Sequence, residues 1–262
     1  MGPKGTFSHE AAALRGDNLL SCCTIPAVME SVVSNQSYEG IVPIENSIEG
    51  PVGITLDGIA HKYDLNIVGE IIIPINQNLL VNRGTRMEDI TDVYSHSQAI
   101  AQCQEFLGNN DFRPHYSIST ANAAKTILGD NSKAAIGNIK SAELYDLEIL
   151  KAHIQDKTNN ETRFVVLSKK YSKPTGNDKT SIIFSIMEDQ PGSLYEILRI
   201  FAENNVNLTK IESRPSKEGL GKYIFFVDFI GHRDDSEIKK VLNQIDENTI
   251  LFKILGSYPI FK

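Results

Sequence analysis

The first two-thirds of the chain alternates short apolar runs with stretches in which apolar residues recur at helical spacing. The apolar runs predict strands at 19–24, 41–44, 65–75, 79–82, 93–96, 112–117, 134–137 and 162–167. The stretches between them predict helices at 25–33, 53–63, 97–107, 120–128 and 138–145, with Thr24 and Ser119 as caps. Strands that alternate with helices of this length predict an α/β fold built on a mainly parallel sheet.

A charged segment, 169–179 (KKYSKPTGNDK), interrupts this alternation and predicts a linker, placed at 173–179. The pattern after it is different, with strands expected at 181–186, 208–214, 223–230 and 250–258 and helices at 192–204 and 235–245. This order, βαββαβ, is typical of the ferredoxin-like fold. We therefore predict a large domain at 1–172 and a smaller domain at 180–262.

The large domain contains two successive sets of strands and helices, which predict two lobes with a cleft between them. Lobe 1 is expected at about 1–73 and 160–172, and lobe 2 at about 74–159. In open α/β sheets, ligands bind at the carboxyl ends of the strands, next to helix N-termini. The polar residues at those positions are therefore the candidates for a binding site.

Composition narrows the function further. The net charge is -7 and the sequence pI about 5.4, which argues against a nucleic-acid partner. The longest apolar run is only strand-sized, and the first residues have no apolar core typical of a signal peptide, so we expect no membrane partner and a cytoplasmic location. The three cysteines and six histidines have no spacing typical of a disulfide framework or a metal site, and the sequence has no GxGxxG or Walker motif.

Four polar segments lie where predicted strands pass into helices or turns. They contain Ser8, in the glycine-containing opening, then Glu45-Asn46-Ser47, Ser97-Gln98 and Ser119-Thr120. Each segment alone is typical of a helix cap or a turn. Their recurrence at strand ends favours a binding cleft.

These segments belong to longer motifs. GPKGTFSHEAA, VPIENSIEGPV, SHSQA, STANAA and ETRFVVLS occur in this order, and together they closely resemble the prephenate dehydratase family over nearly the whole chain. The C-terminal part resembles the ACT domain that regulates this family. Its phenylalanine-binding motifs correspond to GSLY at 192–195, which departs from the usual GALV at two positions, and to ESRP at 212–215.

The resemblance implies a two-lobed catalytic domain similar to type II periplasmic binding proteins, followed by a ferredoxin-like ACT domain. It also implies cofactor-free, metal-free conversion of prephenate to phenylpyruvate, water and CO2 in phenylalanine biosynthesis. Thr162 is expected to assist departure of the ring hydroxyl, with Arg163 and Phe164 in the same motif. The residues expected to line the cleft are Ser8, Glu45, Asn46, Ser47, Ser97, Gln98, Ser119 and Thr120.

The resemblance further implies that phenylalanine regulates the enzyme by binding between paired ACT domains, in a homodimer or homotetramer. The effector residues would be Gly192, Ser193, Leu194, Glu212, Ser213, Arg214 and Pro215. Three alternatives stay open: an arogenate dehydratase, a solute-binding module, and a non-catalytic sensor of an amino acid.

Members of the family normally carry a short apolar strand before GPKGTF, whereas here only Met1 precedes it. That strand would lie inside the first sheet, so its absence would leave partner backbone groups exposed. A misplaced or trimmed start is the expected explanation, and we expect a chain that truly lacks the strand to be less stable.

Overall fold

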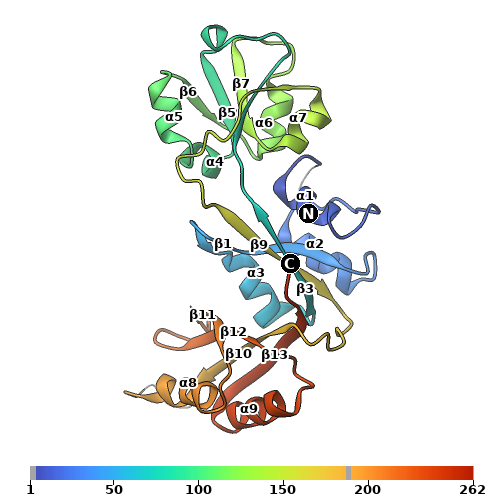
Figure 1. The fold of residues 1–262 in the computed structure, drawn as a ribbon, viewed down its shortest axis with the longest axis vertical. Helices are drawn as coiled ribbons and strands as arrows, with labels where there is room; N and C mark the ends of the chain where they lie inside the picture. Colours follow the sequence, from blue (N-terminus) through green and yellow to red (C-terminus); the bar gives the residue numbers. More distant parts are fainter. Residues whose placement is uncertain (1–3, 187–189, 262) are drawn as a thin grey trace. The chain divides into compact units, whose positions relative to one another are not determined.

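A computed structural model describes residues 4–186 and 190–261, and it places their strands in three sheets (Figure 1). The helices are α1 (Phe7–Ala13), α2 (Ile25–Val33), α3 (Gly53–Asp57), α4 (Ser97–Ala101), α5 (Gln104–Asn109), α6 (Thr120–Thr126), α7 (Ile139–Tyr145), α8 (Ser193–Glu203) and α9 (Ser236–Glu247), with a π-helical turn at Gly58–Lys62 and a 3-10 turn at Met87–Asp89. The strands are β1 (Gly40–Asn46), β2 (Gly50–Pro51), β3 (Asn66–Pro74), β4 (Asn78–Val81), β5 (Asp92–Ser95), β6 (Arg113–Tyr116), β7 (Lys133–Gly137), β8 (Glu148–Lys151), β9 (Glu161–Ser168), β10 (Asp178–Ile186), β11 (Leu208–Pro215), β12 (Tyr223–Ile230) and β13 (Thr249–Pro259).

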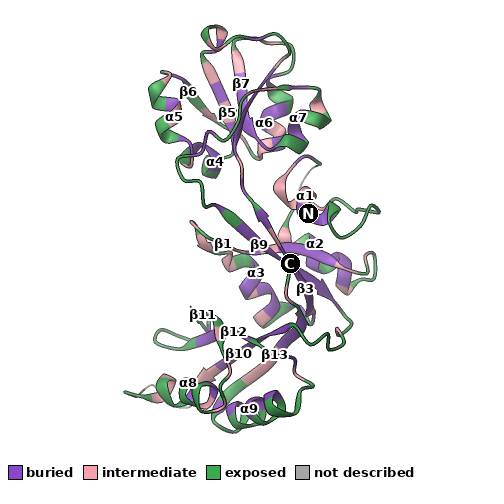
Figure 2. Ribbon diagram, in the orientation of Figure 1, coloured by how far each residue is buried: buried purple, intermediate pink, exposed green. Residues whose placement is uncertain are grey.

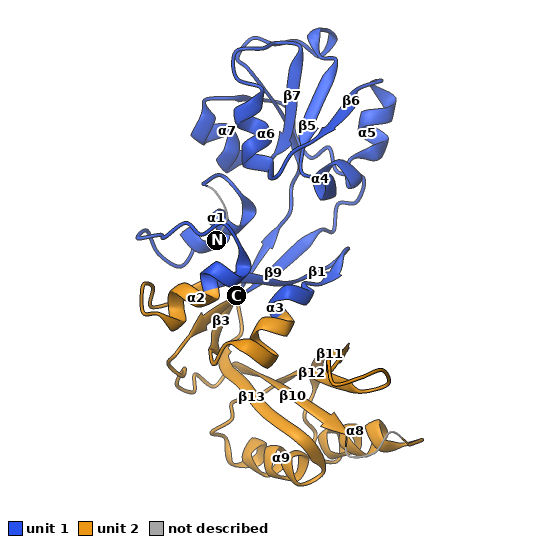
Figure 3. Cartoon of the chain, turned by 180° about the vertical axis from the view of Figure 1, so that it is seen from behind, with its two compact units in different colours: residues 1–28, 41–55, 71–164 blue, residues 29–40, 56–70, 165–262 orange. Residues whose placement is uncertain are grey.

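The chain divides into two compact units, each made of several segments (Figure 3). Unit 1 contains residues 1–28, 41–55 and 71–164, and unit 2 contains residues 29–40, 56–70 and 165–262. The four-stranded sheet of the large domain has the order β2-β1-β9-β3. The predicted alternation of strands and helices is therefore present, and the fold is α/β.

The five-stranded sheet, which belongs to unit 1, has the order β6-β5-β7-β4-β8. β5 pairs in parallel with β6 and β7, while β4 pairs antiparallel with β7 and β8. The expectation of a mainly parallel sheet is thus wrong for this half of the sheet. β4 itself runs antiparallel to β7, and β8, a four-residue strand that the sequence analysis did not predict, adds a second antiparallel pair beside β4.

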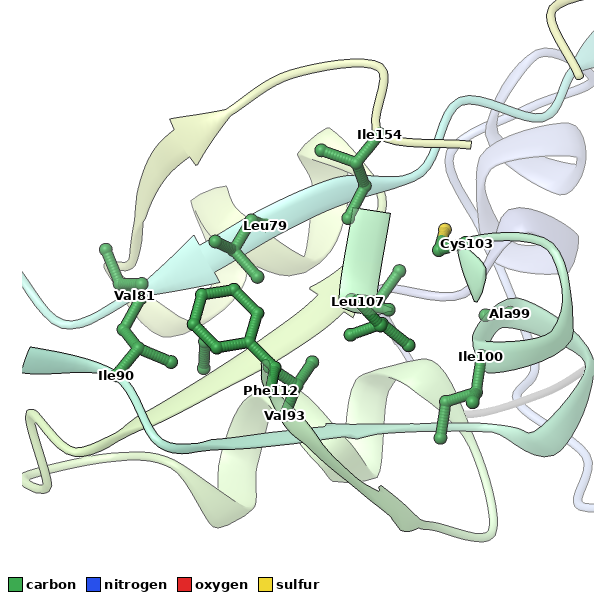
Figure 4. Close-up of a cluster of buried hydrophobic side chains, with 12 residues drawn as sticks. Leu79, Val81, Ile90, Val93, Ala99, Ile100, Cys103, Leu107, Phe112 and Ile154 are labelled. Carbon is green, nitrogen blue, oxygen red and sulfur yellow. The ribbon is translucent and has the colours of Figure 1, made fainter. Parts of the chain in front are cut away.

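One face of this sheet is covered by a buried apolar cluster that includes Leu79, Val93, Leu107, Phe112 and Cys103 (Figure 4). Burial raises the pKa of the Cys103 thiol to about 12, and the nearby Asp156 adds to this effect. A thiol with so high a pKa holds almost no thiolate at neutral pH, so it is chemically inert.

We therefore expect a thiol reagent to modify Cys23, which is exposed, and to leave Cys103 unmodified in the folded protein. Mass spectrometry of peptides after labelling at pH 8, with and without denaturant, measures this directly. Rapid labelling of Cys103 without denaturant would contradict the described packing.

The helix expected at 97–107 is two helices in the structure, α4 and α5, with a break at Gln102 and Cys103. The break coincides with a cap from a distant part of the chain. The Asp156 carboxylate accepts hydrogen bonds from the backbone N–H groups of Gln104 (3.0 Å) and Glu105 (3.2 Å). These are N–H groups that the start of a helix leaves without an intrahelical partner, so the carboxylate stabilises a second N-terminus here.

Two other expectations need correction. Residues 19–24 form no strand; Leu19 and Leu20 are exposed, and no neighbouring strand pairs with them. The helix expected at 53–63 is confirmed only in part, because α3 passes into a π-helical turn in which Tyr63 N–H donates to Gly58 O at 2.9 Å. Gly58 allows this turn to lie against Met29, whose Sδ would be 2.7 Å from an added Cβ.

The C-terminal part of unit 2 has the predicted βαββαβ order, and its sheet has the order β11-β12-β10-β13. β10 pairs antiparallel with both β12 and β13. The apolar faces of α8 and α9 pack on the sheet around Phe184, Phe201 and Phe229, which are buried. Most of β12, in the middle of the sheet, is buried (Figure 2). The ferredoxin-like fold is therefore confirmed.

A buried ion pair joins this ferredoxin-like part to β3, within unit 2. Lys179 Nζ lies 3.0 and 2.9 Å from the two carboxylate oxygens of Glu70, whose side chain is 1% exposed. Phe261 N–H also donates to Glu70 Oε1, at 3.3 Å. Close by, Gly256 of β13 lies so near the backbone of Ile67 that an added Cβ would meet its carbonyl oxygen.

Candidate active site

The ends of β1 and β9 bring together two of the predicted motifs in unit 1. Asn46, the last residue of β1, is 9% exposed, and its Oδ1 accepts hydrogen bonds from the backbone N–H groups of Ile48 (3.0 Å) and Glu49 (2.9 Å). Ser47 fastens the same end of β1 to β9, since its N–H donates to Glu161 O at 2.9 Å and its hydroxyl accepts from Glu161 N–H at 2.9 Å. The sequence had indicated that Glu45 and Asn46 follow the strand, but the structure places both of them on β1.

The two backbone donors on Asn46 Oδ1 determine which way its amide faces. The Nδ2 group must point the other way, where it donates to Thr162 Oγ1 at 2.9 Å and to Glu161 O at 3.0 Å. Thr162 is itself 9% exposed. The structure therefore places Asn46 and Thr162, predicted from two separate motifs, in direct contact.

The direction of this hydrogen bond matters for chemistry. A hydroxyl has one hydrogen and two lone pairs, so a threonine that accepts from Asn46 keeps its own hydrogen for another acceptor. No acceptor for that hydrogen is present among residues 4–186 and 190–261. Thr162 is thus arranged as a hydrogen-bond donor.

Arg163 and Phe164, the other two predicted catalytic residues, have different surroundings. Arg163 is 7% exposed, and its Nη1 forms an ion pair with Glu45 Oε1 at 2.8 Å. This pair connects β9 to β1 beside the contact between Asn46 and Thr162. Phe164 is 2% exposed and belongs to the buried core, which is the surrounding of a packing residue. A catalytic contribution of either residue stays a prediction.

The segments around Ser97-Gln98 and Ser119-Thr120 lie at one edge of the five-stranded sheet. β5, β6 and β7 run in parallel, so the helices that follow them all begin at the carboxyl edge. Ser97 and Gln98 are exposed at the start of α4, where His96 is the cap. Ser119 caps α6, as predicted, by accepting from Asn122 N–H at 3.0 Å.

Ser8 lies in the first turn of α1, two residues after the cap position, which Thr6 takes. Ser141 and Asn138, at the start of α7, hold the α1 segment by donating to Gly5 O (2.7 Å) and Glu10 Oε2 (3.0 Å). The sequence reading missed His9 in this segment. Burial, and then the charge of Lys4, lower the pKa of His9, so its ring is neutral at physiological pH and its Nδ1 accepts from Gly5 N–H.

The predicted effector motifs lie in unit 2. Gly192 has a positive φ of 95° and precedes α8, which begins with Ser193, while Leu194 packs on the apolar core. The ESRP motif forms the end of β11, with Glu212 and Arg214 half-buried and Ser213 and Pro215 exposed. Arg214 Nε lies 3.0 Å from Asp57 Oδ1, at the end of α3, and Lys217 Nζ lies 2.8 Å from Asp57 Oδ2.

The described residues contain no group of three or more His, Cys, Asp or Glu side chains that could hold a metal ion. None of the described helices has the length and apolar character needed to cross a bilayer.

Comparison with known proteins identifies the class to which this arrangement belongs. A family model described as prephenate dehydratase matches residues 1–172, and a model of the ACT domain matches residues 180–247. The bifunctional chorismate mutase/prephenate dehydratase of Aquifex aeolicus is 42% identical over 266 residues, which cover 99% of this chain and 72% of that protein. The prephenate dehydratase of Methanocaldococcus jannaschii is 41% identical over 269 residues, which cover 99% of this chain and 96% of that protein.

A solved structure agrees with these matches. The crystal structure of the Arthrobacter aurescens prephenate dehydratase in complex with L-Phe has a TM-score of 0.89 and 34% identity, and covers 99% of this chain and 89% of that one. The fold and the matches define an α/β enzyme with a C-terminal ACT domain. The chain belongs to the prephenate dehydratase family, and its catalytic domain has the periplasmic-binding-protein-like fold predicted from its motifs.

Proposed function

We propose that this chain converts prephenate to phenylpyruvate, with Thr162 as the group that stabilises the departing hydroxyl. The family supports the reaction, and the hydrogen bond from Asn46 Nδ2 to Thr162 Oγ1 carries the assignment of the residue. This hydrogen bond occupies a lone pair of the Thr162 oxygen and leaves its hydrogen available to the substrate.

The reaction needs few protein groups. The C–O bond to the ring hydroxyl breaks, and so does the C–C bond to the ring carboxylate, whose electron pair completes the aromatic ring. Hydroxide leaves and takes a proton to become water, and the carboxylate leaves as CO2. Negative charge therefore develops on the departing oxygen, where a pre-positioned hydrogen-bond donor stabilises the transition state.

Thr162 suits this role better than that of an acid. A threonine hydroxyl has no tendency to release its proton near neutral pH, but it donates a hydrogen bond well. The neighbouring Arg163 is paired with Glu45, so the ion pair adds little net charge beside the departing oxygen. The polar helix starts at Ser97, Gln98, Ser119 and Thr120 supply further donors, which we assign to the substrate carboxylates.

The test of the reaction is an incubation with prephenate, followed by the absorbance of phenylpyruvate. We expect turnover of prephenate, and the same assay with arogenate determines which of the two is preferred. A purified, folded chain that turns over neither substrate would contradict the proposed activity and favour a non-catalytic binding protein.

The proposal includes regulation by phenylalanine at the ACT domain of a homo-oligomer in the cytoplasm. The ACT domain supports a small-molecule effector, and the ESRP motif supports phenylalanine. The contact between Arg214 and Asp57 supports a route by which effector binding could reach the catalytic domain. Asp57 ends α3, which follows β1 and β2 along the chain, and β1 carries Asn46. Burial raises the pKa of Asp57, but hydrogen bonds from Lys217 and Arg214 outweigh this and lower it, so the contact persists until the pH falls below the usual carboxylate range.

We expect Asp57→Asn to weaken inhibition by phenylalanine several-fold without abolishing phenylalanine binding, because the substitution removes the ion pair with Arg214 but replaces none of the predicted effector residues. Inhibition curves measure the first quantity and calorimetry the second. Asp64→Asn is the matched control. Asp64 is fully exposed, and its ion pair with Lys253 is long, at 3.7 Å, so its loss should have little effect. Unchanged inhibition in Asp57→Asn would rule out this route.

A further inference from the structure

A row of buried and half-buried side-chain amides extends the contact between Asn46 and Thr162 away from β1. Asn46 Nδ2 donates to Asn160 Oδ1 at 2.7 Å, and Asn160 Nδ2 donates to Gln102 Oε1 at 3.1 Å. Gln102 Nε2 in turn donates to Glu49 Oε1 at 3.3 Å. The members come from three separate places in the sequence, around residues 46–49, 102 and 160, all within unit 1.

The direction of every hydrogen bond in this row is determined. The Glu49 carboxylate oxygen accepts, so the Gln102 amide must turn its nitrogen toward it. Gln102 Oε1 then faces Asn160, which must turn its own nitrogen toward Gln102 and its oxygen toward Asn46. This order agrees with the backbone N–H groups on Asn46 Oδ1, so both ends of the row require the same orientation of Asn46.

Asn160 also limits what the Asn46 amide can do. That amide has two hydrogens, and its three acceptors are Asn160 Oδ1, Thr162 Oγ1 and Glu161 O. Asn160, at the shortest of the three distances, takes one hydrogen and fixes the plane of the amide. The other hydrogen is then directed at Thr162 and Glu161.

Burying these side-chain amides costs free energy of folding. Asn160 is 2% exposed, and Gln77, which donates to Gln102 Oε1 at 3.2 Å, is 3% exposed. Within the described parts of the chain, Gln77 Oε1 is a buried oxygen with no hydrogen-bond partner. A buried polar network that is not fully satisfied stabilises the fold less than apolar side chains would, so stability does not explain its presence.

We propose that Asn160 and Gln102 are positioning residues for the dehydration: they hold the Asn46 amide in the orientation that directs the Thr162 hydroxyl hydrogen at the substrate. This inference rests on the proposed role of Thr162. Gln102 and Asn160 also line a pocket of about 180 Å3, together with Ile48, Glu49, Ala101, Gln155, Asp156 and Lys157.

A double-mutant cycle tests the inference. We expect Asn160→Ala to lower kcat about tenfold with KM within about threefold, because a small displacement of a catalytic donor costs turnover more than binding. In a Thr162→Ala background the same substitution should lower kcat less than about twofold, since no hydroxyl remains to be positioned. Asn159→Ala is the matched control: Asn159 is the exposed neighbour of Asn160 and should retain wild-type kcat.

Gln102→Met provides a second variant, because it removes the amide at nearly constant volume and leaves β9 untouched. It should also lower kcat, and it should lose this effect in the Thr162→Ala background. If Asn160→Ala or Gln102→Met lowers kcat of the Thr162→Ala enzyme by the same factor as it lowers kcat of the wild-type enzyme, the positioning role is wrong. If Thr162→Ala itself turns over normally, the proposed function of Thr162 fails instead, and the two outcomes are distinct.

Discussion

Replacing Thr162 with alanine is expected to lower kcat by on the order of 10²-fold or more, the usual effect of removing one donor to a developing negative charge. The physical reason is that Thr162 Oγ1 already accepts from Asn46, so in the proposed role its hydrogen is left for the departing oxygen of the substrate. Steady-state kinetics with prephenate measure the loss.

The fold should survive this substitution. The Asn46 amide keeps Asn160 Oδ1 and Glu161 O as acceptors, so Thr162→Ala leaves no buried donor without a partner. Thr162→Ser, which keeps the hydroxyl, and Thr162→Val, which keeps the shape, form the matched pair. We expect the serine enzyme to be active and the valine enzyme to be as slow as alanine, whereas equal rates for serine and valine would exclude a role for the hydroxyl.

The second large effect is expected on stability. Lys179→Met removes the ammonium group that faces the Glu70 carboxylate in a buried site, where the two side chains are 11% and 1% exposed. Breaking a buried pair in this way costs about 3–5 kcal/mol, which corresponds to a fall in Tm of about 6–20 °C for a chain of this size. Differential scanning calorimetry measures the change.

An exposed pair supplies the control. Lys240 and Glu237 on α9 are 64% and 70% exposed, so Lys240→Met should change the free energy of unfolding by less than about 0.5 kcal/mol. Combining Lys179→Met with Glu70→Leu should recover much of the loss, because an apolar pair of similar volume needs no compensating charge. A Lys179→Met protein with a wild-type Tm would contradict the described burial of the pair.

Apolar periodicity and helix-capping preferences were enough to predict many of the helices and strands. The ferredoxin-like order after the linker followed from apolar periodicity, and the Ser119 cap followed from a serine placed before a run of helix formers. The contact between Asn46 and Thr162 could be anticipated only as two motifs of one site. No sequence pattern predicts the direction of the hydrogen bond between them.

The features that the sequence did not reveal depend on partners far along the chain. α4 and α5 are separate because Asp156 caps α5 from a distant loop, and no pattern within 97–107 shows this. Asn160 lies in a polar stretch of the sequence, and only its hydrogen bonds with Asn46 and Gln102 distinguish it from its neighbours. The prediction of a strand at 19–24 was wrong because an apolar run forms a strand only where a neighbouring strand pairs with it, and no described strand pairs with this run.

The ion pair of Glu70 and the close approach of Gly256 to Ile67 have a consequence for how this protein can be dissected. Removing the residues after 172 would remove more than the proposed phenylalanine site. It would strip β3 of the lysine that neutralises Glu70 and of the glycine strand that covers Ile67, uncovering apolar surface. The ACT domain therefore also supports the catalytic domain, and a change in the activity of the shortened protein would combine a loss of stability with any loss of the proposed regulation.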